Sequence, residues 1–338
     1  MRTVLVTGGL GYIGSHTVVE LQQKDYEVVI ADNLSNSNEK VLDSIEKITG
    51  VKPHFIKADL SLADQCAKVF ELFPEIEGVI NFAAFKAVGE SCDKPVEYYR
   101  NNLNIILNLL EQMIARGIEY FVQSSSCTVY GEPETLPVRE DSPIQRATSP
   151  YGNTKQMAED ILRFASDTGK VKAMALRYFN PIGAHESALI GELPNGVPNN
   201  LMPYITQTAA GIRERLTVFG NDYPTPDGTC IRDFIHVVDL AKAHVVAMDR
   251  FFEHGNKAAF EYFNIGTGRG YSVLEVIRSF EKTTGVKLNY VFGPKRQGDI
   301  IRIWADTALA SEELKWKAEK SLDQMTCSAW KWQLHLKG

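Results

Sequence analysis

The chain contains 338 residues, and its 42 acidic residues outnumber the 36 Lys and Arg, so the formal net charge is −6. This balance argues against nucleic acid as a partner, because domains that bind phosphate backbones carry a basic excess or a basic stripe. The 44% hydrophobic and 23% charged residues are typical of a globular protein, which excludes disordered and fibrous chains. At roughly 150 residues per domain, the length predicts about two lobes.

The cysteines, histidines and apolar runs exclude further classes. Five cysteines are scattered without a C-x-x-C pair, which predicts a reducing compartment, the cytoplasm. The seven histidines form neither H-x-x-x-H nor H-E-x-x-H, so we expect no metal site. No apolar run approaches the ~18 residues that span a bilayer, and residues 3–6 run into glycines rather than into a signal-peptide core. We therefore expect no membrane partner.

Short apolar runs alternate with segments of helical periodicity through the first half of the chain. The runs lie at residues 3–6, 27–31, 54–58, 78–83, 120–124 and 173–179, and the clearest helical segments are 95–116 and 151–165. This alternation predicts βαβ units and a parallel sheet. Because runs such as VLV and EVVIA are apolar throughout, we expect helices on both faces, as in a Rossmann-type doubly wound α/β sheet.

The pattern changes after residue 180. Residues 181–200 are rich in Pro, Gly and Asn, which predicts a long functional loop. A helix near 200–213, a strand at 216–220, a second loop at 221–229 and a Trp-bearing helix near 321–335 are expected to follow. We therefore expect a Rossmann domain at 1–180 and a smaller mixed α/β substrate domain at 181–338. Some C-terminal segments are expected to return to the first domain, with a cleft between the two.

The segment TGGLGYIGSH follows the first strand and contains Gly8, Gly11 and Gly14 in a G-x-x-G-x-x-G pattern. Gly8 allows a tight turn, Gly11 lets the backbone approach a pyrophosphate, and Gly14 permits close contact between helix and strand. Asp32 ends the second strand, where a carboxylate accepts both adenosine ribose hydroxyls and repels a 2′-phosphate, so NAD is favoured over NADP. Asp59 ends the third strand and is either an adenine contact or a turn residue.

Tyr151 and Lys155 form the one Y-x-x-x-K pattern among the 13 tyrosines. Pro150 places them at the start of a helix, where residues i and i+4 share a face. A lysine ammonium lowers the pKa of a neighbouring phenol toward neutrality, so Tyr151 is a candidate general base toward a hydroxyl. The strand upstream ends in the serines 124–126. Because strand ends of a parallel sheet face the ligand crevice, a serine hydroxyl there can orient a substrate alcohol.

Three segments together, TGGLGYIGSH, SSSCTVYGE and SPYGNTK, resemble the extended short-chain dehydrogenase/reductase superfamily. Blocks spread over nearly the whole chain resemble the UDP-glucose 4-epimerase family within it, namely NFAAFKAVGES, EYYRNN, RYFNPIGAH, VPNNLMPYI, FGNDYPTPDGT and RDFIHVVDL. The resemblance implies Tyr151 as the base, Lys155 on the nicotinamide ribose and Ser126 on the sugar 4-hydroxyl.

The resemblance also implies two sets of binding residues. Besides the glycines and the catalytic group, the NAD contacts would be Tyr12, Ile13, Asp32, Asn33, Ser37, Asp59, Leu60, Phe82, Ala83, Lys86, Asn101 and Phe179. The UDP-sugar would meet Lys86, Asn180, Asn200, Phe219, Arg232, Arg296 and Asp299. The two arginines have an independent rationale, because guanidinium groups match phosphate oxygens bidentately.

The implied reaction is the reversible C4 epimerisation of UDP-galactose and UDP-glucose in galactose metabolism. It would pass through a transient 4-keto sugar and enzyme-bound NADH. Cys127 and Thr128 stand where related dehydratases and decarboxylases place an acid, so neither of those activities is expected. Ile303 stands where the family often has a tyrosine beside the sugar C2. Activity on UDP-N-acetylhexosamines is therefore left open, and a plain core role for Ile303 is an equal alternative.

Two further expectations concern assembly and class. Helices 95–116 and 151–165 carry apolar residues on more than one face, among them Ile105, Leu109, Met157, Ile161 and Leu162. The resemblance implies that these helices pair across a homodimer axis, whereas the residues alone fit a buried core equally well. The alternative class is a non-catalytic NAD-binding regulator, which would be expected to lack the tyrosine, lysine or serine.

Overall fold

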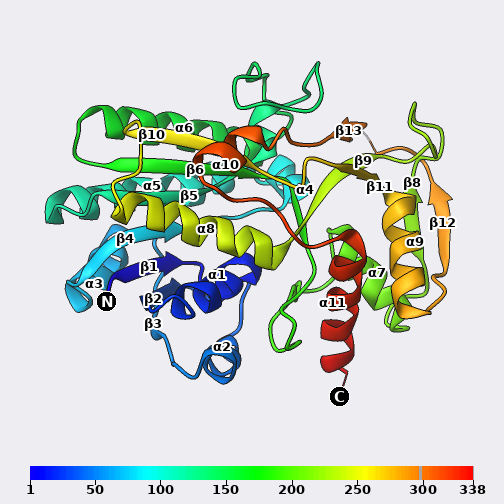
Figure 1. Ribbon diagram of the computed structural model, residues 1–338, viewed down its shortest axis with the longest axis horizontal. Helices are drawn as coiled ribbons and strands as arrows, with labels where there is room; N and C mark the ends of the chain where they lie inside the picture. The colour runs from blue at the N-terminus through cyan, green and yellow to red at the C-terminus, as the bar shows by residue number, and fades with distance from the viewer. Residues whose placement is uncertain (297–298, 338) are drawn as a thin grey trace.

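The computed structural model describes residues 1–296 and 299–337, and a seven-stranded parallel sheet lies at its centre (Figure 1). The strand order is β10-β6-β5-β4-β1-β2-β3, a Rossmann-type order extended by one strand. The strands are β1 (Thr3–Thr7), β2 (Glu27–Asp32), β3 (His54–Lys57), β4 (Ile76–Asn81), β5 (Tyr120–Ser126), β6 (Lys172–Tyr178) and β10 (Phe260–Ile265).

Helices cover both faces of this sheet because its strands are apolar on both sides. In β1, Val4 and Val6 pack into one core with α1 (Tyr12–Gln22), α2 (Val41–Thr49) and α8 (Val237–Phe252). Leu5 points the other way, into a core shared with α3 (Ala63–Leu72), α5 (Pro95–Arg116) and α6 (Pro150–Asp167). The expected doubly wound α/β fold is therefore confirmed. Shorter elements around the sheet are α4 (Val88–Asp93), the 3-10 helix η1 (Cys127–Tyr130) and α10 (Ala308–Glu313).

Two elements from the second half of the chain belong to this sheet and its helical layer. Helix α8 packs against α1, and β10 pairs with β6 in parallel register from Phe260 opposite Ala173 to Ile265 opposite Tyr178. The sequence predicts that C-terminal segments return to the first domain, but its patterns do not show which ones. Because β10 pairs with β6, it forms the seventh strand of the central sheet and lies at its edge.

The other elements form a smaller lobe around a core of its own, centred on residues such as Ile205, Val218 and Phe280. Figure 1 shows its helices α7, α9 and α11 gathered at the end of the molecule away from α3. One sheet holds β9, β11, β13 and the short β7, and a parallel pair holds β8 and β12. The bounds are β7 (Asn180–Ile182), α7 (Leu201–Ala209), β8 (Leu216–Phe219), β9 (Ile231–His236), β11 (Gly270–Ser272), α9 (Val273–Thr284), β12 (Tyr290–Gly293), β13 (Arg302–Ile303) and α11 (Leu322–His335).

The segment expected as a loop at 181–200 contains more structure than its composition suggests. Ala184 forms an antiparallel bridge with Gly191, so the intervening residues make a hairpin. The helix expected at 200–213 ends at Ala209, because Gly211 adopts a left-handed φ of +74° that stops the helix.

Candidate active site

The glycine turn between β1 and α1 forms a cradle that side chains would fill. Gly8 has a φ of +63°, and its N–H donates to Ala31 O at 2.8 Å. A Cβ on Gly14 would collide with the carbonyl oxygen of Gly8, so only glycine permits this close approach. Helix α1 begins after Gly11 without a side-chain cap and without an acidic residue in its first turn. Its free N–H groups and its dipole therefore favour an anion such as a pyrophosphate.

Asp32 ties the end of β2 to this turn. One carboxylate oxygen accepts the N–H of Leu10 at 3.1 Å, and the other accepts the N–H of Leu34 at 2.9 Å and the hydroxyl of Ser37 at 2.7 Å. Asp59 accepts both the N–H and the hydroxyl of Ser61, at 3.0 and 2.7 Å. Asp59 therefore makes the turn expected as one alternative, and it also lines the cavity described next.

A cavity of about 270 Å³ runs from the glycine turn to the start of α6. Every residue that the sequence analysis connects with NAD lines it. They are Gly8, Gly11, Tyr12, Ile13, Gly14, Asp32, Asn33, Ser37, Asp59, Leu60, Phe82, Ala83, Lys86, Asn101, Ser126, Tyr151, Lys155 and Phe179. Asn180 and Asn200, expected on the sugar nucleotide, line the same cavity.

Tyr151, Lys155 and Ser126 meet at one end of this cavity. Helix α6 begins at Pro150, and the Ser149 side chain caps it by accepting the N–H of Gly152 at 3.1 Å. This start places Tyr151 in the first turn and Lys155 one turn later, with the ammonium 5.7 Å from the centre of the tyrosine ring. Lys155 is 5% exposed and donates to the carbonyl oxygen of Ser124 at 2.6 Å.

Burial acts on both titratable groups of this trio. It raises the pKa of Tyr151 well above its ordinary value, with Tyr178 adding to the rise and the Ser126 side chain opposing it. Burial also lowers the pKa of Lys155 to about 8, an effect that Glu159 partly offsets. The expectation from the sequence that Lys155 lowers the pKa of Tyr151 toward neutrality is therefore wrong, because burial outweighs the effect of the nearby ammonium.

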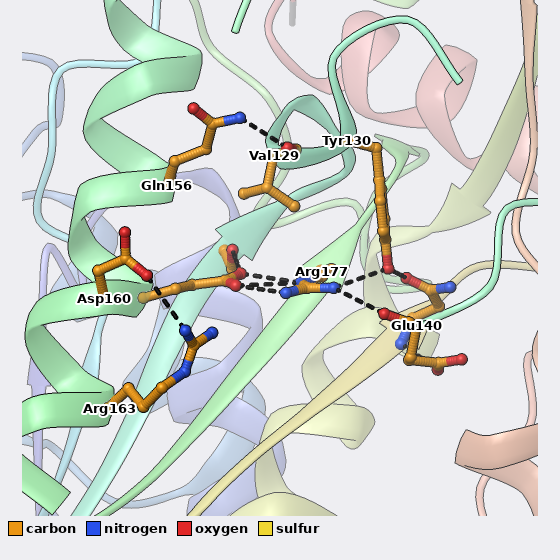
Figure 2. A network of polar contacts seen from close by, with 10 residues as sticks. Val129, Tyr130, Glu140, Gln156, Asp160, Arg163 and Arg177 are labelled. Atoms are coloured by element: carbon orange, nitrogen blue, oxygen red, sulfur yellow. Dashed lines mark hydrogen bonds and ion pairs between the residues drawn. The ribbon is translucent and has the colours of Figure 1, made fainter. Parts of the chain in front are cut away.

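A buried polar network that includes Arg177 fastens α6 to β6 (Figure 2). Arg177 of β6 forks onto both carboxylate oxygens of Glu159, with both side chains at most 4% exposed. Glu159 also accepts the hydroxyl of Ser125 at 2.6 Å, and Arg177 donates to the Tyr130 hydroxyl at 3.0 Å. Because Ser125 precedes Ser126 and Glu159 lies one turn after Lys155, this network orients the trio.

The other expected substrate residues form a second group, which does not line this cavity. The Arg296 guanidinium lies 3.8 Å from the ring centre of Phe219, and Arg232 lies 4.0 Å from a carboxylate oxygen of Asp299. Ile303 of β13 is paired in register with Arg232 of β9. The smaller lobe thus brings two guanidinium groups and an aromatic ring together from segments far apart in the sequence.

Ile303 is 2% exposed and packs in a cluster with Tyr130, Val138 and Phe179. Phe179 lines the cavity, so Ile303 supports its wall from behind. This placement fits the core role that the sequence analysis kept as an alternative.

Three residues that line the cavity make contacts that the sequence analysis does not predict, namely Ser124, Tyr178 and Glu192. The Ser124 hydroxyl bonds the hydroxyl of Tyr178, which places a second phenol beside the trio. Glu192 lies in the segment 181–200 and lines the cavity near Lys86. The only signal for Glu192 in the sequence is the unusual composition of its loop, because no motif marks a single acid within it.

Within residues 1–296 and 299–337, no helix is long and apolar enough to cross a membrane. The same described residues contain no group of three or more His, Cys, Asp or Glu side chains arranged to hold a metal ion.

The fold, the glycine cradle and the Tyr-Lys-Ser trio define a Rossmann-type protein of the short-chain dehydrogenase/reductase class. A family model described as the NAD dependent epimerase/dehydratase family matches residues 4–266. A UDP-glucose 4-epimerase of Bacillus subtilis is 51% identical over 331 residues, which cover 98% of this chain and 96% of that protein. A UDP-glucose 4-epimerase of Erwinia amylovora is 49% identical over 333 residues, covering 98% and 97%.

Solved structures of UDP-glucose 4-epimerases are also similar to this chain. A UDP-glucose-4-epimerase from Stenotrophomonas maltophila, with bound NAD and formylated UDP-arabinopyranose, matches with a TM-score of 0.96 and 47% identity, covering 100% of this chain and 99% of that one. A UDP-glucose 4-epimerase from Bifidobacterium longum, in complex with NAD⁺ and UDP, matches with a TM-score of 0.94 and 46% identity, covering 99% and 98%. The chain belongs to the NAD dependent epimerase/dehydratase family and, within it, to the UDP-glucose 4-epimerases.

Proposed function

We propose that this protein is an NAD-dependent isomerase that interconverts UDP-galactose and UDP-glucose at C4. The observation that carries the proposal is the Tyr151–Lys155–Ser126 trio at one end of a cavity whose other end is the glycine cradle. Relatives of that name share about half of their residues with this chain over nearly its whole length, 51% in one case. The proposed setting is galactose metabolism.

The cavity is proposed to hold NAD. The residues that line the cavity fit NAD. The cradle of Gly8, Gly11 and Gly14 leaves room that a Cβ would fill, and the start of α1 offers uncapped N–H groups to a pyrophosphate. Asp32 ends β2 where the ribose hydroxyls would lie, and its carboxylate disfavours a 2′-phosphate. When bound in this cavity, NAD would supply the hydride chemistry at C4, accepting a hydride in its oxidised form and giving it back in its reduced form.

The trio provides the acid–base chemistry. Tyr151 accepts the proton of the C4 hydroxyl and later returns it, with its phenolate stabilised by the neighbouring Lys155 ammonium. The Ser126 hydroxyl, at the end of β5, orients the sugar alcohol between them. Lys155 is held in place by its bond to Ser124 O, so its charge stays at the cavity end.

The second group is proposed to anchor the nucleotide while the sugar turns. Arg232 and Arg296 supply guanidinium groups for a diphosphate, and Phe219 supplies an aromatic face already covered by Arg296. Asn180 and Asn200 at the cavity, with Asp299 beside Arg232, complete the proposed substrate contacts. A fixed anchor retains the reactive keto sugar, so binding energy remote from C4 serves the chemistry.

The decisive experiment is incubation of the purified protein with UDP-galactose and no added cofactor. We expect UDP-glucose to form, and we expect Tyr151→Phe to lower kcat by about a thousandfold, because it removes the general base. The NAD content and the thermal unfolding midpoint of the variant serve as controls and are expected to match the wild type. An inactive wild-type protein that still carries NAD would instead favour a non-catalytic regulator.

Substrate breadth is tested with UDP-N-acetylgalactosamine under the same conditions. Because Ile303 supports the cavity wall as a buried core residue, we propose UDP-galactose and UDP-glucose as the principal substrates. Comparable rates for the N-acetylated sugar would contradict this strict preference.

We also propose a homodimer formed through α5 and α6, and a division of labour between an NAD lobe at 1–180 and a sugar-nucleotide lobe at 181–338. In this division α8 and β10 return to the first lobe.

A cytoplasmic location is proposed because the five cysteines are unpaired. Fractionation that recovers the protein outside the cytoplasm would contradict that location.

A further inference from the structure

Glu192 is a buried acid that the proposed mechanism does not use. Its side chain is 10% exposed, and it lines both the 270 Å³ cavity and an adjoining cavity of about 850 Å³. One carboxylate oxygen accepts the side-chain amide of Asn200 at 2.6 Å and lies 3.9 Å from the ammonium of Lys86. Lys86 follows β4 of the central sheet, whereas Glu192 and Asn200 belong to the segment before α7. The carboxylate thus joins two expected substrate contacts from different parts of the fold.

Glu192 directly follows the hairpin closed by Ala184 and Gly191, and this end of the hairpin is anchored on α11. The indole N–H of Trp332 donates to the carbonyl oxygen of Glu192 at 3.0 Å. A Cβ on Gly191 would meet the Trp332 ring, so the hairpin lies flat against the indole. Because Gly191 and the Glu192 carbonyl are both held against the indole, the fold sets the position of the carboxylate over the cavity.

Asn200 is the residue before the first turn of α7, and its side chain makes no capping bond to that helix. Asparagine at this position ordinarily accepts a helix N–H, and loss of such a cap costs about 1 kcal/mol. Here the amide turns to Glu192 instead. The helix start gives up a local bond, and the amide is held beside the cavity.

The Lys86 ammonium carries the positive charge that faces the Glu192 carboxylate. Burial raises the pKa of its carboxyl, and Lys86 and Asn200 oppose that rise. At 3.9 Å the Lys86 ammonium is within Coulombic reach of the carboxylate but not in a close hydrogen bond, so it remains free to donate to a phosphate.

We propose that Glu192 is a positioning residue for the sugar nucleotide, which holds the Asn200 amide and the Lys86 ammonium together at the cavity. The proposal rests on the proposed function, because both partners are expected substrate contacts. It assigns Glu192 to binding of the substrate and not to the proton transfer at C4. A mutation there is therefore expected to change KM more than kcat.

The test compares Glu192→Ala with Glu192→Gln in steady-state assays with UDP-galactose. The alanine variant loses both contacts, and its KM is expected to rise about tenfold with kcat within threefold of the wild type. The glutamine variant keeps an acceptor for Asn200 but loses the charge facing Lys86, so its KM is expected to rise about threefold. Glu186→Ala, an exposed acid in the same hairpin, is the matched control and is expected to leave KM unchanged.

Two further measurements separate positioning from simple loss of structure. In an Asn200→Ala background, replacing Glu192 with alanine is expected to raise KM by less than threefold, because the partner through which it acts is gone. Calorimetry with UDP, which needs no turnover, is expected to show weaker binding by Glu192→Ala at an unchanged unfolding midpoint. A wild type that binds UDP without converting UDP-galactose would contradict the proposed function. Wild-type KM and UDP affinity in Glu192→Ala, or an undiminished effect in the Asn200→Ala background, would overturn the assignment of Glu192.

Discussion

At the scale of single residues, the Tyr151–Lys155 pair is held in an environment that opposes both of its charged forms. Burial raises the pKa of the phenol and lowers the pKa of the ammonium to about 8. The two effects have one cause, the exclusion of water from the cavity end. Ionisation of Tyr151 would therefore need a positive charge close by, and the Lys155 ammonium lies 5.7 Å from the centre of its ring.

This dependence gives a prediction for Lys155→Met, which keeps the length of the side chain but removes the charge. We expect kcat with UDP-galactose to fall about a hundredfold at pH 7. The remaining activity is expected to rise steadily with pH, because the isolated phenol ionises only under alkaline conditions. Rates measured from pH 6 to pH 10 check this, with Lys155→Arg as the variant that keeps the charge. A methionine variant within threefold of the wild type, with the same pH profile, would show that the ammonium is not needed.

At the scale of elements, α5 and α6 each have one face in the core and another that is exposed and apolar. Ile105, Leu109 and Leu162 are buried against the sheet, whereas Met157 is 38% exposed. Further exposed apolar residues are Val96, Leu107 and Ile114 on α5 and Phe164 on α6. Positions 7 or 11 residues apart lie on one stripe of a helix, so the exposed apolar residues of each helix share a stripe. The core alternative therefore holds for the faces of these helices that pack on the sheet, whereas the subunit interface stays a prediction for the exposed faces.

The proposed homodimer predicts that charges on these stripes separate the subunits. Light scattering after size exclusion is expected to give the mass of two chains for the wild type and of one chain for the double variant Leu107→Glu, Phe164→Glu. The physical reason is that an unpaired carboxylate in an apolar interface costs several kcal/mol. Val51→Glu, a change of an equally exposed residue outside these helices, is expected to leave the mass unchanged. A one-chain mass for the wild type would rule out the dimer.

At the scale of the whole molecule, buried histidines make stability depend on pH. Burial lowers the pKa of His244 to about 4, from an ordinary value of 6.5. His244 is fully buried on α8, with its ring 4.6 Å from that of Phe82, and its Nε2 has no partner among the described residues. Burial likewise lowers the pKa of His236 to about 4 and that of His16 to about 3. Between these values and 6.5 the unfolded chain binds protons that the folded chain does not, so stability falls as the pH falls through this window.

The prediction at this scale concerns His244→Leu, which removes one of these buried rings. Urea unfolding at pH 7 and pH 5 is expected to show that the wild type loses about 2 kcal/mol more stability than the variant over this interval. His335→Leu, at an exposed position on α11, is the control and is expected to follow the wild type. Equal pH dependence for the wild type and His244→Leu would mean that His244 is protonated in the folded protein as easily as in the unfolded one.

Most of the sheet and of the trio could be predicted because their signals are local. The apolar runs, the glycine turn and the Tyr151–Lys155 spacing each lie within a few residues of one another, where backbone geometry relates them directly. The membership of β10 in the central sheet could not be predicted in the same way. Its partner β6 is far away in sequence, and nothing in its own composition distinguishes it from a strand of the smaller lobe.

Local patterns in the sequence are enough to predict the class of this protein: the Rossmann-type order of elements, the NAD-type glycine turn with its acid, and the Tyr-Lys-Ser trio that is proposed for catalysis. Only the tertiary structure decided which side chains from distant segments meet. Arg232 lies beside Asp299, Arg296 lies over Phe219, and Glu192 joins Lys86 to Asn200. The physical reason is that local patterns reflect backbone propensity and burial of one face, whereas contacts between lobes depend on how the whole chain packs.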